Sequence, residues 1–464
     1  MNNTMVMNHC RWLLATAVGA VFVTQVSSLR AQEADYGLYE ELRSKRKIVG
    51  PLVGHVTDTT ASIWAYAGPR TTPVVLEIAE LATGASAIGG DEDSAEEPFR
   101  ARLEETPNAE KHHEVEFHVT GLRPATRYAF AVRLAEDEEA VEPGLLTTAP
   151  AAGEGAKFRL AVSSCFGNTY RRNDGRTRAE REYLNNSWRL LMKQEPDLQL
   201  IIGDIVYADS TDYNHLWDSH VLERTANAPF GQALRLMPTY AVWDDHDYGP
   251  NNSDGTAKGK EGSLRAFDEV YANPPRQGGG GPGIYTSFGW GGVDFFLLDG
   301  RYHRTPNEAP ENEDKKYLGD EQFEWLIRQL KASEAPFKLL VNGSTWNTSK
   351  DDSWRLFPHE RKRLWKALVE NDVNAVVFVS GDIHRCDLPL HFPEVDGAYF
   401  MPEITSSGLG SHGENDAMAF VVVDFDTTAK DPTFTARVID GEERETLRRT
   451  VRASDLRVGA GDEH

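Results

Sequence analysis

Four short polar segments of this chain hold residue types that bind metal ions and move protons. They contain aspartate, histidine, tyrosine and cysteine, and they are residues 164–167 (Ser-Cys-Phe-Gly), 203–207 (Gly-Asp-Ile-Val-Tyr), 243–247 (Trp-Asp-Asp-His-Asp) and 381–385 (Gly-Asp-Ile-His-Arg). Carboxylates gathered in one place repel one another, and some must take up protons unless a cation lies between them. If these segments meet in the fold, their chemistry is that of a metal centre.

Each polar segment directly follows a short apolar run, and this predicts where the fold places it. The runs cover residues 160–163, 198–202, 240–242 and 375–379. In open α/β sheets, ligands bind in the crevice beyond the carboxyl ends of the strands. The glycines before Asp204 and Asp382 let the chain turn sharply off its strand. One Gly-Asp pair after a strand is more often an ordinary turn, and a lone histidine is more often structural, but four such clusters favour a functional site.

The strand pattern changes once along the chain, which predicts two domains. Between residues 48 and 148, short alternating runs are separated by turn residues, so we expect a small all-β sandwich of the fibronectin or immunoglobulin type. Residues 121–128 resemble the tyrosine corner of fibronectin type III modules. Residues 149–156 have the composition of a linker. Residues 157–457 alternate buried-type strands with helical spacing, which predicts an α/β domain, and residues 458–464 form a C-terminal tail.

The expected elements follow from the period of the apolar residues. The clearest strands of the sandwich are 62–67, 74–78, 114–119 and 127–134. The expected strands of the α/β domain are 158–162, 198–202, 239–242, 293–298, 337–341 and 375–380. The expected helices are 178–193, 213–223, 261–271, 319–332 and 360–370, and a closing hairpin joins 419–425 to 433–438.

The N-terminal residues have the features of an export signal. Arg11 precedes an apolar run over residues 12–23, and the chain then turns polar and small up to Ala31. The run is short for a membrane span, so we expect a signal peptide over residues 1–31 that directs the protein to the periplasm or the extracellular space. An uncleaved N-terminal anchor is the alternative. Residues 32–47 form an N-terminal extension, and the sequence offers no second membrane candidate.

The net charge limits the classes of partner that the protein can bind. The whole chain carries −23, and removal of residues 1–31, which contain two arginines and no acid, leaves −25. Such a surface repels nucleic acid and anionic lipid, so we expect no long nucleic-acid partner. Two cysteines, Cys165 and Cys386, remain outside the signal. In an exported protein they would by default form a disulfide bond.

The polar segments together resemble the calcineurin-like metallophosphoesterases, in particular the PhoD-like alkaline phosphatase branch. The resemblance rests on Gly-Asp-x-x-Tyr at 203–207, Trp-Asp-Asp-His-Asp at 243–247, Gly-Asp-x-His at 381–384 and Ser-Cys-Phe at 164–166. Leu-Asp-Gly-Arg at 298–301, and Gly-Pro at 50–51 followed by Gly-His-Val-Thr at 54–57, also match that branch. It covers essentially the whole chain after the signal. It implies a metallophosphoesterase sandwich of two mixed sheets flanked by helices, preceded by the small all-β domain.

The resemblance also implies metal ligands. Asp204 would bridge metal ions, and Tyr207 and Cys165 would be anionic ligands of Fe(III). As a ligand of iron, Cys165 could not pair with Cys386, so this interpretation competes with the disulfide bond. The other implied ligands are Asp245, Asp382 and His384. Additional oxygen donors would suit Ca²⁺, and Mn or Zn are further candidates.

Other implied roles are less closely tied to a motif. His246 would protonate the leaving oxygen, and Asn252 is a further candidate oxygen donor. Two interpretations of Arg301 stay open, bidentate binding of a phosphate oxygen or an ion pair that stabilises the domain. Many members of the superfamily have a separate histidine before the last motif; here Asn342 and Ser344 hold that place, so the number of metal ions stays open.

These features predict an exported, metal-dependent hydrolase of small phosphate mono- or diesters. Water activated at the Asp204 cluster would attack phosphorus directly, with His246 assisting the leaving alkoxide. A nuclease- or phospholipase-type phosphodiesterase on the same scaffold is the first alternative. The second is a non-catalytic exported binding protein whose sandwich does the work, and the intact acidic clusters argue against it.

Overall fold

The structure is a computed structural model that describes residues 48–459 except 69, 82–97, 138–141, 168–177, 277–280, 349–351 and 411–417. The predicted signal peptide (1–31), the N-terminal extension (32–47) and the last five residues of the predicted tail lie outside the described residues. Within them, none of the helices combines the length and the apolar character that crossing a lipid bilayer requires.

The first seven strands form two small antiparallel sheets. Strands β1 (Val49–Val56), β2 (Thr60–Tyr66) and β5 (Glu114–Thr120) make one sheet, and β4 (Arg100–Glu105), β3 (Val74–Glu80), β6 (Arg127–Leu134) and β7 (Glu142–Thr147) make the other, in these orders. Alternate residues of β6 are buried, as a strand with one solvated face requires. The buried Tyr128 hydroxyl accepts a hydrogen bond from the backbone N–H of Arg123 at 2.8 Å, within the segment that resembles a tyrosine corner.

A first mixed sheet follows, with strand order β10-β9-β8-β18-β19-β20. Strands β8 (Lys157–Ser163), β9 (Leu198–Ile202) and β10 (Thr239–Val242) are parallel. Strands β18 (Ala419–Asp426), β19 (Thr433–Asp440) and β20 (Glu445–Arg452) add antiparallel neighbours.

A second mixed sheet has the order β11-β12-β13-β14-β17-β15. Strands β12 (Val293–Leu297), β13 (Phe337–Val341), β14 (Val376–Ser380) and β17 (Met401–Ser406) are parallel, whereas β11 (Thr286–Trp290), β15 (Cys386–Asp387) and β16 (Leu390–His391) pair antiparallel with their neighbours. The rings of Phe337 in this sheet and Phe434 in the first sheet lie 5.3 Å apart, and Tyr240 stacks on Phe288 at 3.7 Å. The two sheets therefore share a core.

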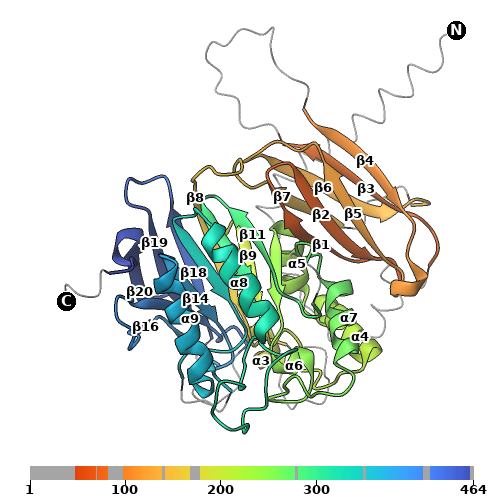
Figure 1. Cartoon of the computed structure of the whole chain (residues 1–464). Coiled ribbons are helices and arrows are strands. Elements are labelled where there is room, and N and C mark those ends of the chain that lie inside the picture. Colours follow the sequence, from red (N-terminus) through yellow and green to blue (C-terminus); the bar gives the residue numbers. More distant parts are fainter. Residues whose placement is uncertain are drawn as a thin grey trace, which may run out of the picture.

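Helices cover these sheets. Helices α8 (Asp320–Ala332) and α9 (Pro358–Glu370) lie on one side of the molecule, whereas α4 (Tyr213–Ala226), α5 (Ala228–Leu236) and α7 (Lys260–Val270) lie near the N-terminal strands (Figure 1). Helices α3 (Arg178–Lys193) and α6 (Asp245–Tyr248) are the other helices of the described residues, which also hold short 3₁₀ turns at Ala109–Lys111, Trp354–Leu356 and Ala453–Asp455. The predicted α/β organisation with mixed sheets is confirmed.

The N-terminal strands pack directly on the α/β part. The Tyr240 hydroxyl on β10 accepts a hydrogen bond from the Val56 N–H at 3.2 Å and donates to the Val56 carbonyl at 3.1 Å. Gly54 lies so close to Ala272 that a Cβ at this position would come within 2.3 Å of its carbonyl oxygen. Glycine is therefore required at this contact. The hydrogen bonds of Tyr240 fix the end of β1 against β10, the strand that leads to residues 243–247.

Candidate metal centre

The carboxyl ends of β8, β9, β10 and β14 bring the four polar segments together. Tight backbone turns mark the points where the chain leaves three of these strands: Cys165 (φ 57°), Asp204 (φ 51°), Asp382 (φ 70°) and His384 (φ 55°) all have left-handed backbone conformations. Non-glycine residues in this region cost free energy and gather at functional sites. Gly203 is required as well, because a Cβ there would come within 2.5 Å of the Asp244 side chain.

Four of the predicted ligands surround one point. The Cys165 Sγ lies 3.3 Å from Asp204 Oδ2, and the Tyr207 hydroxyl lies 3.4 Å from the same oxygen. The Tyr207 hydroxyl is also 3.4 Å from His384 Nε2. Donor atoms of Cys165, Asp204 and His384 all lie within 4.8 Å of one another. A thiol, a phenol, a carboxyl and an imidazole thus converge on a single position.

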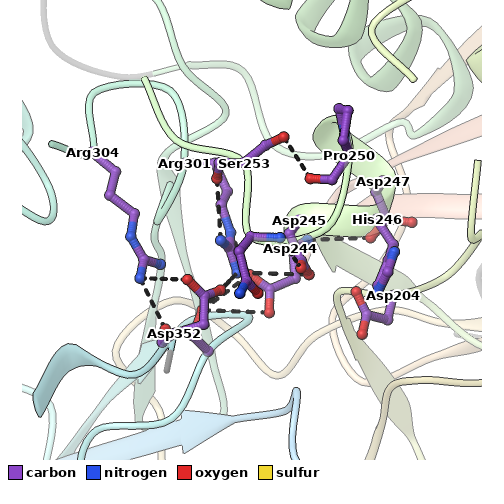
Figure 2. Close-up of polar contacts among 12 residues, drawn as sticks. Asp204, Asp244, Asp245, His246, Asp247, Pro250, Ser253, Arg301, Arg304 and Asp352 are labelled. Atoms are coloured by element: carbon purple, nitrogen blue, oxygen red, sulfur yellow. Dashed lines mark hydrogen bonds and ion pairs between the residues drawn. The ribbon is translucent and has the colours of Figure 1, made fainter. Parts of the chain in front are cut away.

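A second group of donors adjoins the first and shares Asp204 with it. Donor atoms of Asp204, Asp245 and His246 also lie within 4.8 Å of one another, and the three residues are seen together in Figure 2. Both Asp204 Oδ1 and Asp245 Oδ1 are buried and have no hydrogen-bond partner among the described residues. A buried carboxylate oxygen without a hydrogen bond is costly. Asp245 Oδ1 lies 3.7 Å from the Arg301 guanidinium, and a bound cation would satisfy both carboxylate oxygens.

The pKa values of the clustered residues also favour a bound cation. Burial, together with the charge of Asp245, raises the pKa of Asp204 well above its usual value. Burial and the Asp204 carboxylate likewise raise the pKa values of Cys165 and Tyr207. A positive ion at this position would oppose each shift, because it stabilises the anionic forms.

Asp382 lies beside these two groups. It is buried at the end of β14, and its charge adds to the shifts at Asp204 and Cys165. It belongs to none of the converging donor groups found within the described part of the chain. Asn252, the weaker candidate, contacts the site through its backbone, because its N–H donates to Asp245 Oδ2 at 2.7 Å.

Arg301 lies beneath the site, and its contacts favour the ion pair over phosphate binding. Its side chain is fully buried, and its Nε donates to Asp244 Oδ1 at 2.7 Å. Its guanidinium also pairs with Asp352 at 2.5 Å, as Figure 2 shows. Ser344 Oγ accepts from Arg301 and donates to Asp244 at 3.1 Å. The guanidinium thus pairs with two buried carboxylates, which favours the ion pair among the two interpretations of Arg301 that the sequence left open.

His246 has a carboxylate partner that the sequence analysis missed. The His246 Nδ1 lies 2.6 Å from Asp209 Oδ1. Burial alone would lower the pKa of His246, but the hydrogen bond to Asp209 and the charges of Asp245 and Asp247 raise it above the usual value. The sequence offered Asp209 as a candidate partner of the site, since it stands only two residues after Tyr207.

Asp247 and Ser407 are two further residues whose contacts the sequence analysis did not anticipate. Asp247 Oδ1 accepts the backbone N–H groups of Ile205 and Val206 at 2.9 and 2.8 Å, which joins the loop after β9 to the loop after β10. Ser407 Oγ lies 2.9 Å from Cys165 Sγ. Cys165 and Cys386 are both free cysteines, so the disulfide alternative is not realised in this structure.

Known proteins are similar to this chain in sequence and in fold. Residues 160–457 match the model of a family described as PhoD-like phosphatase. The alkaline phosphatase D of Bacillus subtilis (strain 168) is 24% identical over 357 residues, which are 65% of this chain and 59% of that protein. The chain thus matches less than two thirds of the length of this relative.

Two solved structures share the fold. A structure of PhoD superposes with a TM-score of 0.67 at 19% identity, covering 88% of this chain and 91% of the other. The purple acid phosphatase PPD1 from yellow lupin (Lupinus luteus) seeds superposes with a TM-score of 0.58 at 12% identity, covering 87% and 74%. At these identities the likeness concerns the fold.

Proposed function

Because the chain belongs to the PhoD-like phosphatase family, we propose that it is a metal-dependent phosphoesterase that hydrolyses small phosphate mono- or diesters. One observation carries the proposal. Asp204 lies between two groups of residues whose donor atoms converge, Cys165 and His384 in one, and in the other Asp245, beside His246, which we assign to proton transfer rather than to metal binding. A carboxylate has two oxygens to share, so Asp204 would hold both of two bound metal ions.

The donor atoms of the two groups differ in chemistry, which supports two kinds of ion. Cys165, Tyr207 and His384 offer sulfur, phenolic oxygen and nitrogen beside Asp204, a set that suits Fe(III). Asp245 and Asp382 offer carboxylate oxygens, which Ca²⁺ prefers, although Mn or Zn would also accept them. When bound, such ions lower the pKa of water and neutralise charge on a phosphate.

Other residues of the site transfer protons or hold the proposed metal ligands in position. Asp209 accepts the hydrogen on His246 Nδ1, which leaves Nε2 to carry the proton for the leaving oxygen. Asp247 and the Arg301–Asp244 pair lock the loops after β9 and β10. Since Arg301 is buried, we assign the neutralisation of negative charge on the substrate phosphate to the metal ions.

The test combines metal analysis with a chromogenic monoester and a chromogenic diester. We expect the purified chain to contain bound metal, to hydrolyse at least one ester and to lose activity on chelation. Asp204→Asn should lower turnover about 100-fold or more. Asp372→Asn is a matched control, because Asp372 has the same φ of 51° but is exposed and outside the donor groups. Near wild-type activity in Asp204→Asn would refute the site.

The iron assignment has a separate readout. A tyrosinate bound to Fe(III) colours a protein, so the wild-type chain should absorb visible light and Tyr207→Phe should lose that band at equal iron content. A colourless and fully active wild-type enzyme that contains no iron would overturn the assignment of Tyr207 and Cys165.

A further inference from the structure

Ser407 joins two loops that carry proposed metal ligands. It directly follows β17 and is buried, with 1% of its surface exposed. Its Oγ lies 2.9 Å from Cys165 Sγ, and the backbone N–H of His384 donates to the same Oγ at 2.8 Å. Cys165 follows β8 in the first sheet and His384 follows β14 in the second, so one hydroxyl connects ligand loops from both sheets.

The available hydrogens determine which group donates in each of these hydrogen bonds. The His384 N–H has a hydrogen to give, so Ser407 Oγ is the acceptor in that bond and keeps its own hydrogen for the sulfur. Ser164 Oγ is also near the sulfur, at 3.3 Å, but it donates to the Ser406 carbonyl at 3.0 Å. Of the two serine hydroxyls beside Cys165 Sγ, Ser407 is therefore the one with a hydrogen directed at the sulfur.

We propose that Ser407 is a positioning residue that donates a hydrogen bond to the Cys165 sulfur and fixes His384 at the correct distance from it. The proposal rests on the proposed function, since it concerns the residues assigned there to iron. A hydrogen bond to an anionic sulfur is stronger than one between neutral groups, so it should form best when metal is bound. Partners of this kind, outside the ligands themselves, commonly change metal affinity 10- to 100-fold.

The adjacent serine supplies a matched control. Ser406 is equally buried at 1%, and its Oγ makes two hydrogen bonds to backbone groups, besides a contact with the Cys386 thiol at 3.9 Å. It donates to the Val162 carbonyl at 2.6 Å and accepts from the Val421 N–H at 3.1 Å. Neither partner is a proposed ligand. Ser406→Ala therefore reports the general cost of removing a buried hydroxyl at this junction between the sheets.

The experiment compares wild type, Ser407→Ala and Ser406→Ala as full-length chains. Iron affinity is measured by competition with a chelator, and the stability of the metal-free chains by urea unfolding. We expect both variants to unfold at lower urea concentration, but only Ser407→Ala to bind iron roughly 10- to 100-fold more weakly. Equal iron affinity in the two variants would overturn the proposal, because Ser407 would then be a structural residue like its neighbour.

A second variant covers the case in which Ser407→Ala does not fold. Ser407→Thr keeps the hydroxyl, so its iron affinity should stay within about threefold of wild type; a loss of tenfold or more would contradict the role of the hydroxyl. The proposed function fails on a different result, namely a folded wild-type chain that binds no metal ion and hydrolyses no ester.

Discussion

The carboxylate of Asp209 is the residue-scale feature with the clearest consequence for catalysis. It lies 2.6 Å from His246 Nδ1 and contributes to the raised pKa of that imidazole. In Asp209→Asn the charge is lost, so the pKa of His246 should fall. If protonated His246 is the acid, activity must then disappear at a lower pH. We expect turnover to fall about 10-fold or more, and the alkaline limb of the pH–rate profile to move to lower pH.

The measurement is kcat/KM for a chromogenic ester across the pH range. Asp212→Asn is the matched control, because Asp212 is exposed, lies three residues away and caps α4, a role that asparagine fills equally well. An alkaline limb that stays in place in Asp209→Asn would show that His246 is not the titrating acid.

At this scale, residue type and position in the sequence agree for Cys165, Asp204, Tyr207 and His384. Their segments follow apolar runs, the family resemblance implies that they are ligands, and their donor atoms lie close together in the structure. Their roles as metal ligands stay predictions. The sequence could not decide between the two interpretations of Arg301, since its partner Asp352 stands in a loop that no strand pattern locates. Ser407 belongs to no sequence motif, so only its contacts in the structure connect it with the site.

Strand β10 matters at the element scale because it is a short edge strand that leads directly into residues 243–247. Edge strands carry unpaired backbone groups. Here the side chain of Asn273 replaces a neighbouring strand, because its Oδ1 accepts the Ala241 N–H at 3.0 Å and its Nδ2 donates to the Ala241 carbonyl at 2.8 Å. One side chain thus satisfies both backbone groups of Ala241.

Asn273→Ala should therefore weaken both stability and metal binding. It leaves two buried backbone groups without their partner, which costs roughly 1–3 kcal/mol. Urea unfolding measures that loss, and metal content after dialysis shows whether Asp245 is still held in place. Asn214→Ala, on an exposed position of α4, is the control and should change neither quantity. Wild-type stability in Asn273→Ala would mean that β10 needs no support at its edge.

The elements differed in how well sequence pattern located them. The parallel strands β9, β10 and β13 have the predicted bounds, because strands buried on both faces are continuous apolar runs. Strand β1 was not predicted, since two glycines and Pro51 interrupt its pattern. Helix α5 was missed because Asn227 both ends α4 and caps α5, and Pro229 and Gly231 weaken the helical signal.

At the scale of the whole molecule, the N-terminal strands and the α/β part share a buried polar junction. Trp64 Nε1 on β2 lies between Glu114 Oε2 at 2.7 Å and the Glu269 carbonyl at 2.8 Å. The fully buried Arg224 on α4 stacks on the Trp64 ring at 4.6 Å and on Tyr271 at 4.8 Å. The linker predicted from composition therefore does not separate the two parts, and the junction should unfold together with both.

Glu114 makes this junction sensitive to pH. Burial raises the pKa of Glu114 to about 7, with the Glu269 carboxylate adding to the shift and the Trp64 hydrogen bond opposing it. The folded chain thus holds this proton more tightly than the unfolded chain does. The stability that the protonated carboxyl contributes is complete below pH about 4.5 and is lost as pH rises to about 7. At about 1.4 kcal/mol per pKa unit, the loss is at most on the order of 3 kcal/mol.

Glu114→Gln should remove this dependence, because the amide oxygen still accepts the Trp64 N–H and carries no charge at any pH. Its urea midpoint should match wild type near pH 4, below the unfolded pKa of the carboxyl, and exceed it at pH 8. Glu105→Gln, on the exposed strand β4, is the control and should follow wild type at both pH values. If Glu114→Gln were less stable than wild type at pH 8, the ionised carboxylate would be the stabilising form, held there by Lys111 at 3.4 Å.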